Sequence, residues 1–136
     1  MPPSAWPYHR TVQIRVDHVK LPVADLQRTK AFYLAALAPL GYELVFDGPE
    51  SIGLGNADRE PIAFQLATRP SVGTHIALTA AETAAVDAFH TAALAAGGRD
   101  NGSPGLRPYG GEYYAAFVLD PDGHNIEAVY HGGRET

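Results

Sequence analysis

The sequence predicts an α+β fold in which two βαβββ modules follow one another and form a curved mixed sheet or half-barrel around a shared cavity. Three observations predict it: an internal repeat, a strand followed by a helix at the start of each copy, and alternating periodicity after each helix. When the sequence is shifted by 57 residues, residues 18–41 align with residues 75–98 without a gap, and ten of 24 positions are identical. The matches other than alanine are His18/His75, Leu21/Leu78, Phe32/Phe89, Leu37/Leu94 and Gly41/Gly98.

The first module is expected to begin with a strand over residues 14–23, which is rich in β-branched side chains. Asp25 can cap the helix that follows to about Ala38, and Pro39 with Gly41 ends it. Turn residues then separate three short segments that alternate between apolar and polar side chains. These segments predict strands over 42–46, 51–54 and 61–67.

The second module repeats this order, with a strand over 74–78 and a helix that Gly97 and Gly98 end. Thr79 and Glu82 have the spacing of a capping box. The helix side chains expected to face the core are Val86, Phe89, Ala93 and Leu94. A weak strand around 99–100 and strands over 113–119 and 125–130 complete the module, with a turn at 120–123 between the last two.

The length of 136 residues suits one domain. We expect an N-terminal arm over residues 1–12 and a single domain over 13–136, with module one at 13–70 and module two at 71–131. Apolar residues make up 46% and charged residues 18%, which is typical of a folded globular protein.

Composition also limits the partners. The chain has no cysteine, which excludes disulfides and thiolate metal sites. A net charge of -5, with ten scattered Lys and Arg residues, argues against a nucleic-acid partner. No apolar run approaches the roughly 20 residues that span a bilayer. The first residues do not read as a signal peptide, so we expect no membrane partner and a cytoplasmic location.

Four polar side chains are expected on the face of the strands that points away from the helices. Strand alternation places His18 and His75 there, and it places Gln65 and Glu127 opposite apolar neighbours in the last strand of each module. Two histidines and a carboxylate suit a divalent metal ion such as Zn, Ni, Mn, Co or Fe. Such a metal would act as a Lewis acid on two neighbouring oxygens of a small-molecule substrate.

Aromatic and basic residues near these positions are candidates for substrate binding. Phe64, Phe117 and Tyr113 could line a pocket for an apolar substrate, although sheet packing is the more common role for such residues. Arg107 and Tyr109 lie in a segment, 107–111, that reads as a loop over the cavity mouth, where Arg107 could bind an anionic group. An ordinary solvated loop is the alternative. The remaining histidines, His90, His124 and His131, are expected at the surface.

Several motifs resemble the vicinal-oxygen-chelate superfamily, which includes glyoxalases, extradiol dioxygenases and fosfomycin- and bleomycin-resistance proteins. They are Asp17-His18-Val19, Ala31-Phe32-Tyr33, Thr74-His75-Ile76-Ala77 and the segment 120–127, an Asp-Pro-Asp-Gly turn leading into a strand with Glu127. The resemblance covers nearly the whole chain except about a dozen N-terminal residues. Segments 38–42 and 95–102 look like a subgroup described only as glyoxalase-like.

The resemblance implies that His18, His75 and Glu127 match three of the four metal-ligand positions of the superfamily, with Gln65 at or near the fourth. Glyoxalase I enzymes usually have a second glutamate at that fourth position, so Gln65 departs from their pattern. Glu127 matches the glutamate assigned as their proton shuttle. A His-His-Glu set is also similar to extradiol dioxygenases and fosfomycin-resistance transferases, and a His-Gln-His-Glu set looks like methylmalonyl-CoA epimerase.

The expected function is that of a glyoxalase-like, divalent-metal-dependent lyase or isomerase that acts on a small substrate with vicinal oxygens, with Glu127 moving a proton. One alternative is a metal-free small-molecule binding protein of the bleomycin-resistance type. Another is an Fe(II) extradiol dioxygenase. A homodimer is expected, because paired modules of this kind commonly form twofold dimers, with the site inside one chain or between two.

Overall fold

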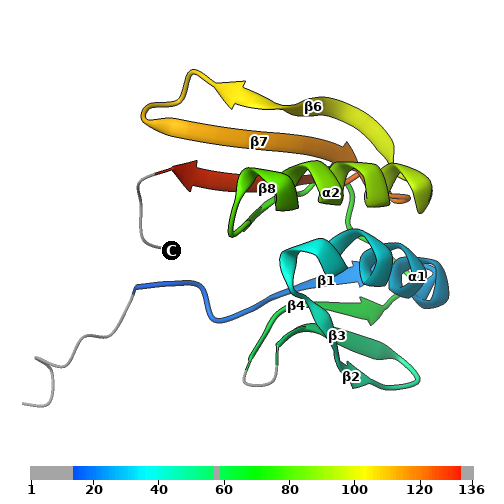
Figure 1. Ribbon diagram of the computed structural model, residues 1–136. Helices are drawn as coiled ribbons and strands as arrows, with labels where there is room; N and C mark the ends of the chain where they lie inside the picture. The colour runs from blue at the N-terminus through cyan, green and yellow to red at the C-terminus, as the bar shows by residue number, and fades with distance from the viewer. Residues whose placement is uncertain (1–13, 57–58, 133–136) are drawn as a thin grey trace, which may run out of the picture.

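The computed structural model describes residues 14–56 and 59–132, so the predicted arm at residues 1–12 lies outside the described residues. The first module contains β1 (Val19–Val23), α1 (Leu26–Leu37), the short 3-10 helix η2 (Ala38–Leu40), β2 (Glu43–Asp47), β3 (Ser51–Asn56) and β4 (Arg59–Leu66). The second contains β5 (His75–Thr79), α2 (Thr83–Ala95), β6 (Arg99–Arg107), β7 (Glu112–Leu119) and β8 (Asn125–Gly132) (Figure 1). The two predicted βαβββ modules are confirmed.

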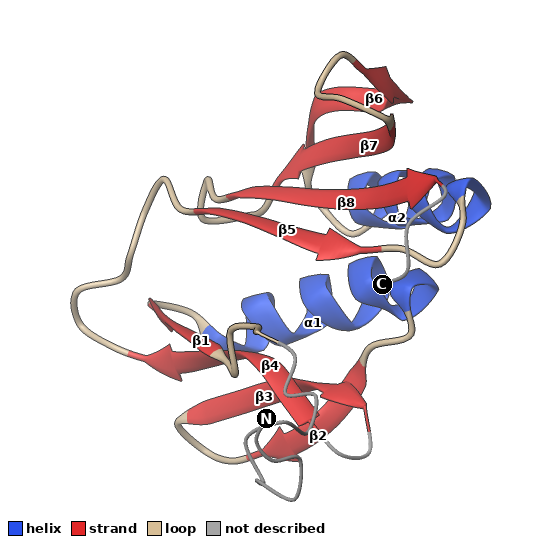
Figure 2. Ribbon diagram, turned by 90° about the vertical axis from the view of Figure 1, so that its left-hand side faces the viewer, coloured by secondary structure: helices blue, strands red, loops and turns tan. Residues whose placement is uncertain are grey.

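Each module folds into its own four-stranded mixed sheet. The strand orders are β1-β4-β3-β2 and β5-β8-β7-β6, so corresponding strands take corresponding places. In each sheet the first strand pairs in parallel with the last, and the other pairs are antiparallel. Figure 2 shows the two sheets as separate layers of strands, and neither closes into a barrel. The α+β fold class is confirmed.

The helices begin in two different ways. Asp25 caps α1 as predicted, because its side chain accepts a hydrogen bond from the backbone N–H of Arg28 at 3.0 Å. The predicted capping box of α2 is not formed: Glu82 is the residue at the cap, and its side chain makes no capping hydrogen bond. Leu94 is 37% exposed, so the prediction that it faces the core is wrong.

One hydrophobic core joins the modules. Helices α1 and α2 pack against each other and against their own sheets (Figure 1). The largest fully buried side chains of this core come from both modules and include Phe32, Tyr33, Phe64, Phe89 and Ile126. Burying a side chain of this size contributes roughly 1.5–3 kcal/mol, so docking of the modules is a substantial part of the stability.

The turn between β7 and β8 holds helix α1 of the other module. Arg28 on α1 forms an ion pair with Asp122 of this turn. Asp120 accepts hydrogen bonds from the backbone N–H groups of Asp122 and His124, which shapes the turn. The acidic turn predicted from the sequence therefore also links the two modules.

The segment between β4 and β5 is fixed by a buried histidine. His124 is fully buried, so the expectation that it lies at the surface is wrong. Its Nδ1 accepts the backbone N–H of Thr74 at 3.0 Å, and its Nε2 lies 3.3 Å from the hydroxyl of Ser71. The backbone N–H of Ser71 in turn donates to the carbonyl of Pro22 in β1 at 2.9 Å. A polar chain thus ties the connecting segment to both modules.

Two predicted strand boundaries differ from the structure. Residues 14–18 precede β1 and are not part of it, and β6 runs on to Arg107, well beyond the weak strand predicted at 99–100. Gly102, with φ +153, and Gly105 interrupt the apolar alternation of β6, which hides this strand from the sequence pattern. Within residues 14–56 and 59–132, no helix is long and apolar enough to cross a membrane.

Candidate active site

The face of the second sheet that lies opposite α2 gathers most of the predicted site residues, and we call it the open face. Alternation decides which side chains occupy it, because Val118, Ile126 and Ala128 point into the core under α2. Their neighbours therefore point the other way. The side chains that define the open face are His75 on β5, Glu127 on β8, Tyr113 and Phe117 on β7, and Arg107 on β6.

His75 and Glu127 are brought together at the centre of this face. Nε2 of His75 lies 3.1 Å from Oε1 of Glu127. The His75 side chain is 49% exposed and the Glu127 side chain is 3% exposed, so the pair joins an accessible imidazole to a buried carboxylate.

The hydrogen bonds of His75 determine which of its nitrogens carries a proton. Nδ1 of His75 lies 2.9 Å from the carbonyl oxygen of Asn125, which can only accept, so Nδ1 donates. In a neutral imidazole Nε2 then has a lone pair and no proton. The lone pair of Nε2 and the carboxylate of Glu127 are both acceptors. At 3.1 Å they repel each other unless a proton or a metal cation lies between them.

Tyr113 holds the other oxygen of the carboxylate, since its hydroxyl donates to Oε2 of Glu127. Burial raises the pKa of Tyr113 to about 12, and the hydrogen bond to the Glu127 carboxylate acts in the same direction. Tyr113 is therefore a proton donor at neutral pH. The rings of Tyr109 and His131 pack edge-on against the Tyr113 ring, each with centroids 5.0 Å apart, and fix its orientation.

Phe117 separates His75 from Arg107 on the open face. The ring of Phe117 is stacked against the imidazole of His75 with centroids 6.2 Å apart. The guanidinium carbon of Arg107 lies 5.3 Å from the centroid of the same ring, which is cation–π distance. Arg107, predicted in a loop, is instead the last residue of β6, and its side chain extends back along the sheet.

An apolar cavity of about 290 Å³ lies beside His75, where the edges of the two sheets meet. It is lined by residues from both modules: Val16, Val19, Pro61, Ile62, His75, Ile76, Ala77 and Leu78. This volume is at the lower end of the range for small-molecule sites. The imidazole of His75 therefore faces both the Glu127 carboxylate and an apolar space.

His18 is not among the residues that line this cavity. Its neighbours Val16 and Val19 line the cavity, while its own Nδ1 bonds the carboxylate of Asp17 at 2.7 Å. Across residues 14–56 and 59–132, no three His, Cys, Asp or Glu side chains lie close enough together to hold a metal ion. His75 and Glu127 therefore fit a metal as a pair, because two ligand atoms about 2.1 Å from one ion lie about 3 Å apart. His18 does not complete a set of three here.

The other predicted residues occupy different positions. Phe64 is fully buried and its ring packs on Tyr33 with centroids 4.5 Å apart, so it belongs to the core under α1 and not to the open face. Gln65, the weak candidate for a fourth ligand, is half-buried on β4 and pairs with Ser51 and Pro22. Tyr109 is 63% exposed at the rim of the open face.

Sequence reasoning missed two features of the site. The first is the backbone carbonyl of Asn125, which sets the proton position on His75; side-chain patterns cannot reveal a backbone acceptor. The second is Oδ1 of Asn125, a buried oxygen with no hydrogen-bond partner among the described residues. The position of Asn125 two residues before Glu127, in register with His75, was the available signal.

A family model described as the Glyoxalase/Bleomycin resistance protein/Dioxygenase superfamily matches residues 15–128. No curated protein matches the chain. Among solved structures, a glyoxalase/bleomycin resistance protein from Albidiferax ferrireducens T118 is 27% identical, with a TM-score of 0.75, and the alignment covers 85% of this chain and 97% of that one.

Two further structures are similar. A glyoxalase-related enzyme from Fulvimarina pelagi is 25% identical, with a TM-score of 0.68, over 86% of this chain and 88% of that one. A lactoylglutathione lyase from Agrobacterium tumefaciens is 20% identical, with a TM-score of 0.67, over 91% and 100%, and supports the fold alone. The resemblance drawn from the motifs is thus confirmed: with its repeated βαβββ modules and a family match over residues 15–128, the chain belongs to the Glyoxalase/Bleomycin resistance protein/Dioxygenase superfamily.

Proposed function

We propose that this protein is a divalent-metal-dependent lyase or isomerase that acts on a small substrate with vicinal oxygens. The single observation that carries the proposal is the 3.1 Å approach of Nε2 of His75 to Oε1 of Glu127. Both atoms are acceptors when the imidazole is neutral, and the pair is stabilised by a cation between them. The similarity to a glyoxalase-related enzyme supports the same reading.

His18 is the proposed third ligand. Its Nδ1 bonds an oxygen of Asp17, as the Nδ1 of His75 bonds the carbonyl of Asn125, so both histidines keep the lone pair on Nε2. A carboxylate or carbonyl partner on the second nitrogen is the usual support of a metal-bound histidine. Val16 and Val19, close to His18 in the chain, line the cavity beside His75, which puts this segment near the pair. Gln65 remains a weak fourth candidate.

A metal ion held there would supply Lewis acidity toward two neighbouring oxygens of the substrate. The chain supplies the proton chemistry. The buried carboxylate of Glu127 can take a proton from the carbon next to the polarised oxygen and return it to a neighbouring atom. Tyr113, bonded to Oε2, keeps the carboxylate in one orientation during this transfer. The ring of Phe117, beside the imidazole of His75, supplies an apolar surface next to the pair.

A second function is supported by a different observation: within residues 14–56 and 59–132, no three His, Cys, Asp or Glu side chains lie close enough together to hold a metal ion. If His75 is protonated, the contacts His75–Glu127–Tyr113 form a complete ion-pair and hydrogen-bond network without a metal. The protein would then bind a small molecule on the open face without transforming it. An iron ion in the site would instead favour ring-cleaving dioxygenase chemistry.

The test is elemental analysis of protein purified without chelator or affinity metal. We expect about one equivalent of Zn, Ni, Mn, Co or Fe in the parent. The metal should be lost in His75→Ala and Glu127→Ala, reduced in His18→Ala and retained in His90→Ala, since His90 lies on α2, opposite the open face, and bonds Asp100. Zn, Ni, Co or Mn would favour lyase or isomerase chemistry, and Fe would favour the dioxygenase. No bound metal, and none taken up on titration, would contradict the proposal in favour of the binding protein.

The proposal includes a homodimer, because paired modules commonly associate about a twofold axis. It also includes a location in the cytoplasm. Sedimentation velocity over a range of protein concentrations tests the dimer. A single species at 14.5 kDa at all concentrations would contradict it.

A further inference from the structure

Arg107 is a charged side chain whose position is fixed by the protein and whose charge is not matched by an acid. Its Nη1 donates to the carbonyl of Gly105 at 2.9 Å and its Nη2 donates to the carbonyl of Ser103 at 2.7 Å. The third contact is the ring of Phe117. Within residues 14–56 and 59–132, none of the salt bridges joins a carboxylate to Arg107.

The strand β6 is shaped to leave room for this arrangement. A Cβ atom at Gly102 would lie 2.9 Å from the Phe117 ring and 3.2 Å from Nη2 of Arg107, and one at Gly105 would lie 3.2 Å from Nη1. Any larger residue at either place would displace the ring or the guanidinium. The glycines that weaken β6 as a strand therefore make the stack of Arg107 on Phe117 possible.

The guanidinium still has donors available for a ligand. Of its five N–H groups, two are used by the carbonyls, which leaves three that can donate to a carboxylate. Because two carbonyls and a ring already hold the side chain, binding an anion costs little further ordering.

The position of Arg107 sets the size of the ligand. Phe117 contacts both Arg107 and His75. The centroid of its ring lies 5.3 Å from the guanidinium carbon of Arg107 and 6.2 Å from the centroid of the His75 imidazole. An anion at Arg107 is therefore within the length of a small organic acid from the pair His75–Glu127. Between these ends lie Phe117 and the ring of Tyr113, and beyond His75 lies the apolar cavity.

We propose that Arg107 is the anchor for a carboxylate, and that the ligand of the open face is a small organic acid with a planar or apolar body. The body lies along Phe117 and Tyr113, and the end remote from the carboxylate reaches His75 and Glu127. This inference rests on the proposed function only in taking the open face as the ligand site; it requires neither a bound metal nor catalysis.

The test compares benzoate with benzamide, its neutral counterpart of the same shape, by titrating ¹⁵N-labelled protein and following the backbone amide shifts of β6 and β7. A charge-assisted hydrogen bond contributes about 1.5–3 kcal/mol, so benzoate should bind at least about tenfold more tightly. Arg107→Met keeps the contact with Phe117 and should reduce the ratio to about one. Arg107→Lys keeps the charge without the fork and should give an intermediate ratio.

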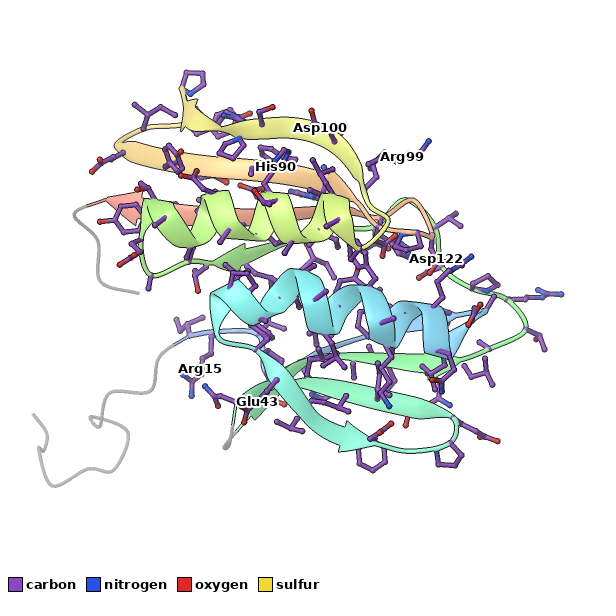
Figure 3. The ribbon with its side chains drawn as sticks, turned by 45° about the vertical axis from the view of Figure 1, so that its right-hand side comes forward. Arg15, Glu43, His90, Arg99, Asp100 and Asp122 are labelled. Atoms are coloured by element: carbon purple, nitrogen blue, oxygen red, sulfur yellow. The ribbon has the colours of Figure 1, made fainter. Side chains whose placement is uncertain are left out.

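Arg99→Met is the matched control. Arg99 begins the same strand, is exposed, and points away from the body of the molecule in Figure 3, so its removal should leave the ratio unchanged. Two results would overturn the inference. One is a ratio of benzoate affinity to benzamide affinity that is the same in the parent and both Arg107 variants. The other is no benzoate shift on the open face at about 10 mM, since an acid held by a charged anchor should bind at that concentration. Metal binding with no preference for benzoate over benzamide overturns only the anchor. A preference for benzoate with no bound metal overturns only the proposed function.

Discussion

The hydroxyl of Tyr33 on α1 donates a hydrogen bond at 2.5 Å to Oδ2 of Asp120, which lies 87 residues away in the turn of the other module. Both groups are buried: Tyr33 is 1% exposed and Asp120 is 3% exposed. Asp120 Oδ1 is already used inside the turn, so Tyr33 is the side chain that satisfies the second oxygen. The contact joins two motifs that the sequence presents far apart.

Tyr33→Phe should therefore lower the free energy of unfolding by about 1–3 kcal/mol, because it leaves a buried carboxylate oxygen without its donor. Urea denaturation followed by circular dichroism measures the change. Tyr114→Phe is the control: it also removes a bond from a tyrosine to an aspartate, Asp87, but at an exposed position within module two. A loss as small as that of the control would show that the contact contributes little to docking of the modules.

The same contact predicts a dependence of stability on alkaline pH. Burial, followed by the charge of Asp120, raises the pKa of Tyr33 far above its usual value of 10.0. The folded state therefore keeps a proton that the unfolded state releases. The contribution of Tyr33 to stability is complete below about pH 10 and falls above it by up to about 1.4 kcal/mol per pH unit.

Denaturation series between pH 8 and pH 11 test this for the parent and for Tyr33→Phe. The free energy of unfolding of the variant should fall less steeply with pH than that of the parent, and the two slopes should differ by the contribution of one proton. Identical slopes would mean that Tyr33 ionises as readily in the folded protein as in the unfolded chain.

The architecture was predictable because each local pattern agrees with the repeat. Asp25 caps α1, and the alternation of 125–130 places Glu127 opposite Ile126, as strand geometry requires. The same alternation places His75 on the face of Glu127. Alternation gives the face of a side chain but not its rotamer, so it could not show that His18 bonds Asp17.

The rest depends on contacts between distant segments. His124 lies next to turn residues and resembles a surface residue in the sequence, yet the segment carrying Ser71 and Thr74 folds over it. Arg107 begins the segment 107–111, which the sequence predicts as a loop, and it follows a stretch that contains Gly102 and Gly105. In the structure β7 supplies a partner strand, and tertiary pairing outweighs the low strand propensity of glycine.

Tyr113→Phe should weaken metal binding without unfolding the protein. The hydroxyl of Tyr113 orients the proposed ligand Glu127, and the removal of such a supporting hydrogen bond typically lowers metal affinity about 10–100-fold. Competition with a chromophoric chelator measures the affinity, and Tyr130→Phe, on the adjacent strand, serves as a control. An affinity equal to that of the parent would leave Tyr113 with a role in ligand contact alone.

Gly41 and Gly98 occupy equivalent places in the repeat but need glycine for different reasons. Gly41 has φ +88 and open space around it, so Gly41→Ala is opposed by backbone conformation and should cost about 1 kcal/mol. Gly98 has no such φ, but a Cβ there would lie 2.5 Å from Val118 and 3.0 Å from Phe32, in the core that joins the modules. Overpacking of this kind costs roughly 1–3 kcal/mol, and the backbone oxygen of Ala93 at 2.9 Å blocks relief in another direction. We expect Gly98→Ala to lower the urea midpoint more than Gly41→Ala. Gly98→Ala combined with Val118→Ala should lower stability by less than the sum of the two single changes. If the double variant is no more stable than the sum of the single changes predicts, the strain at Gly98 does not come from Val118.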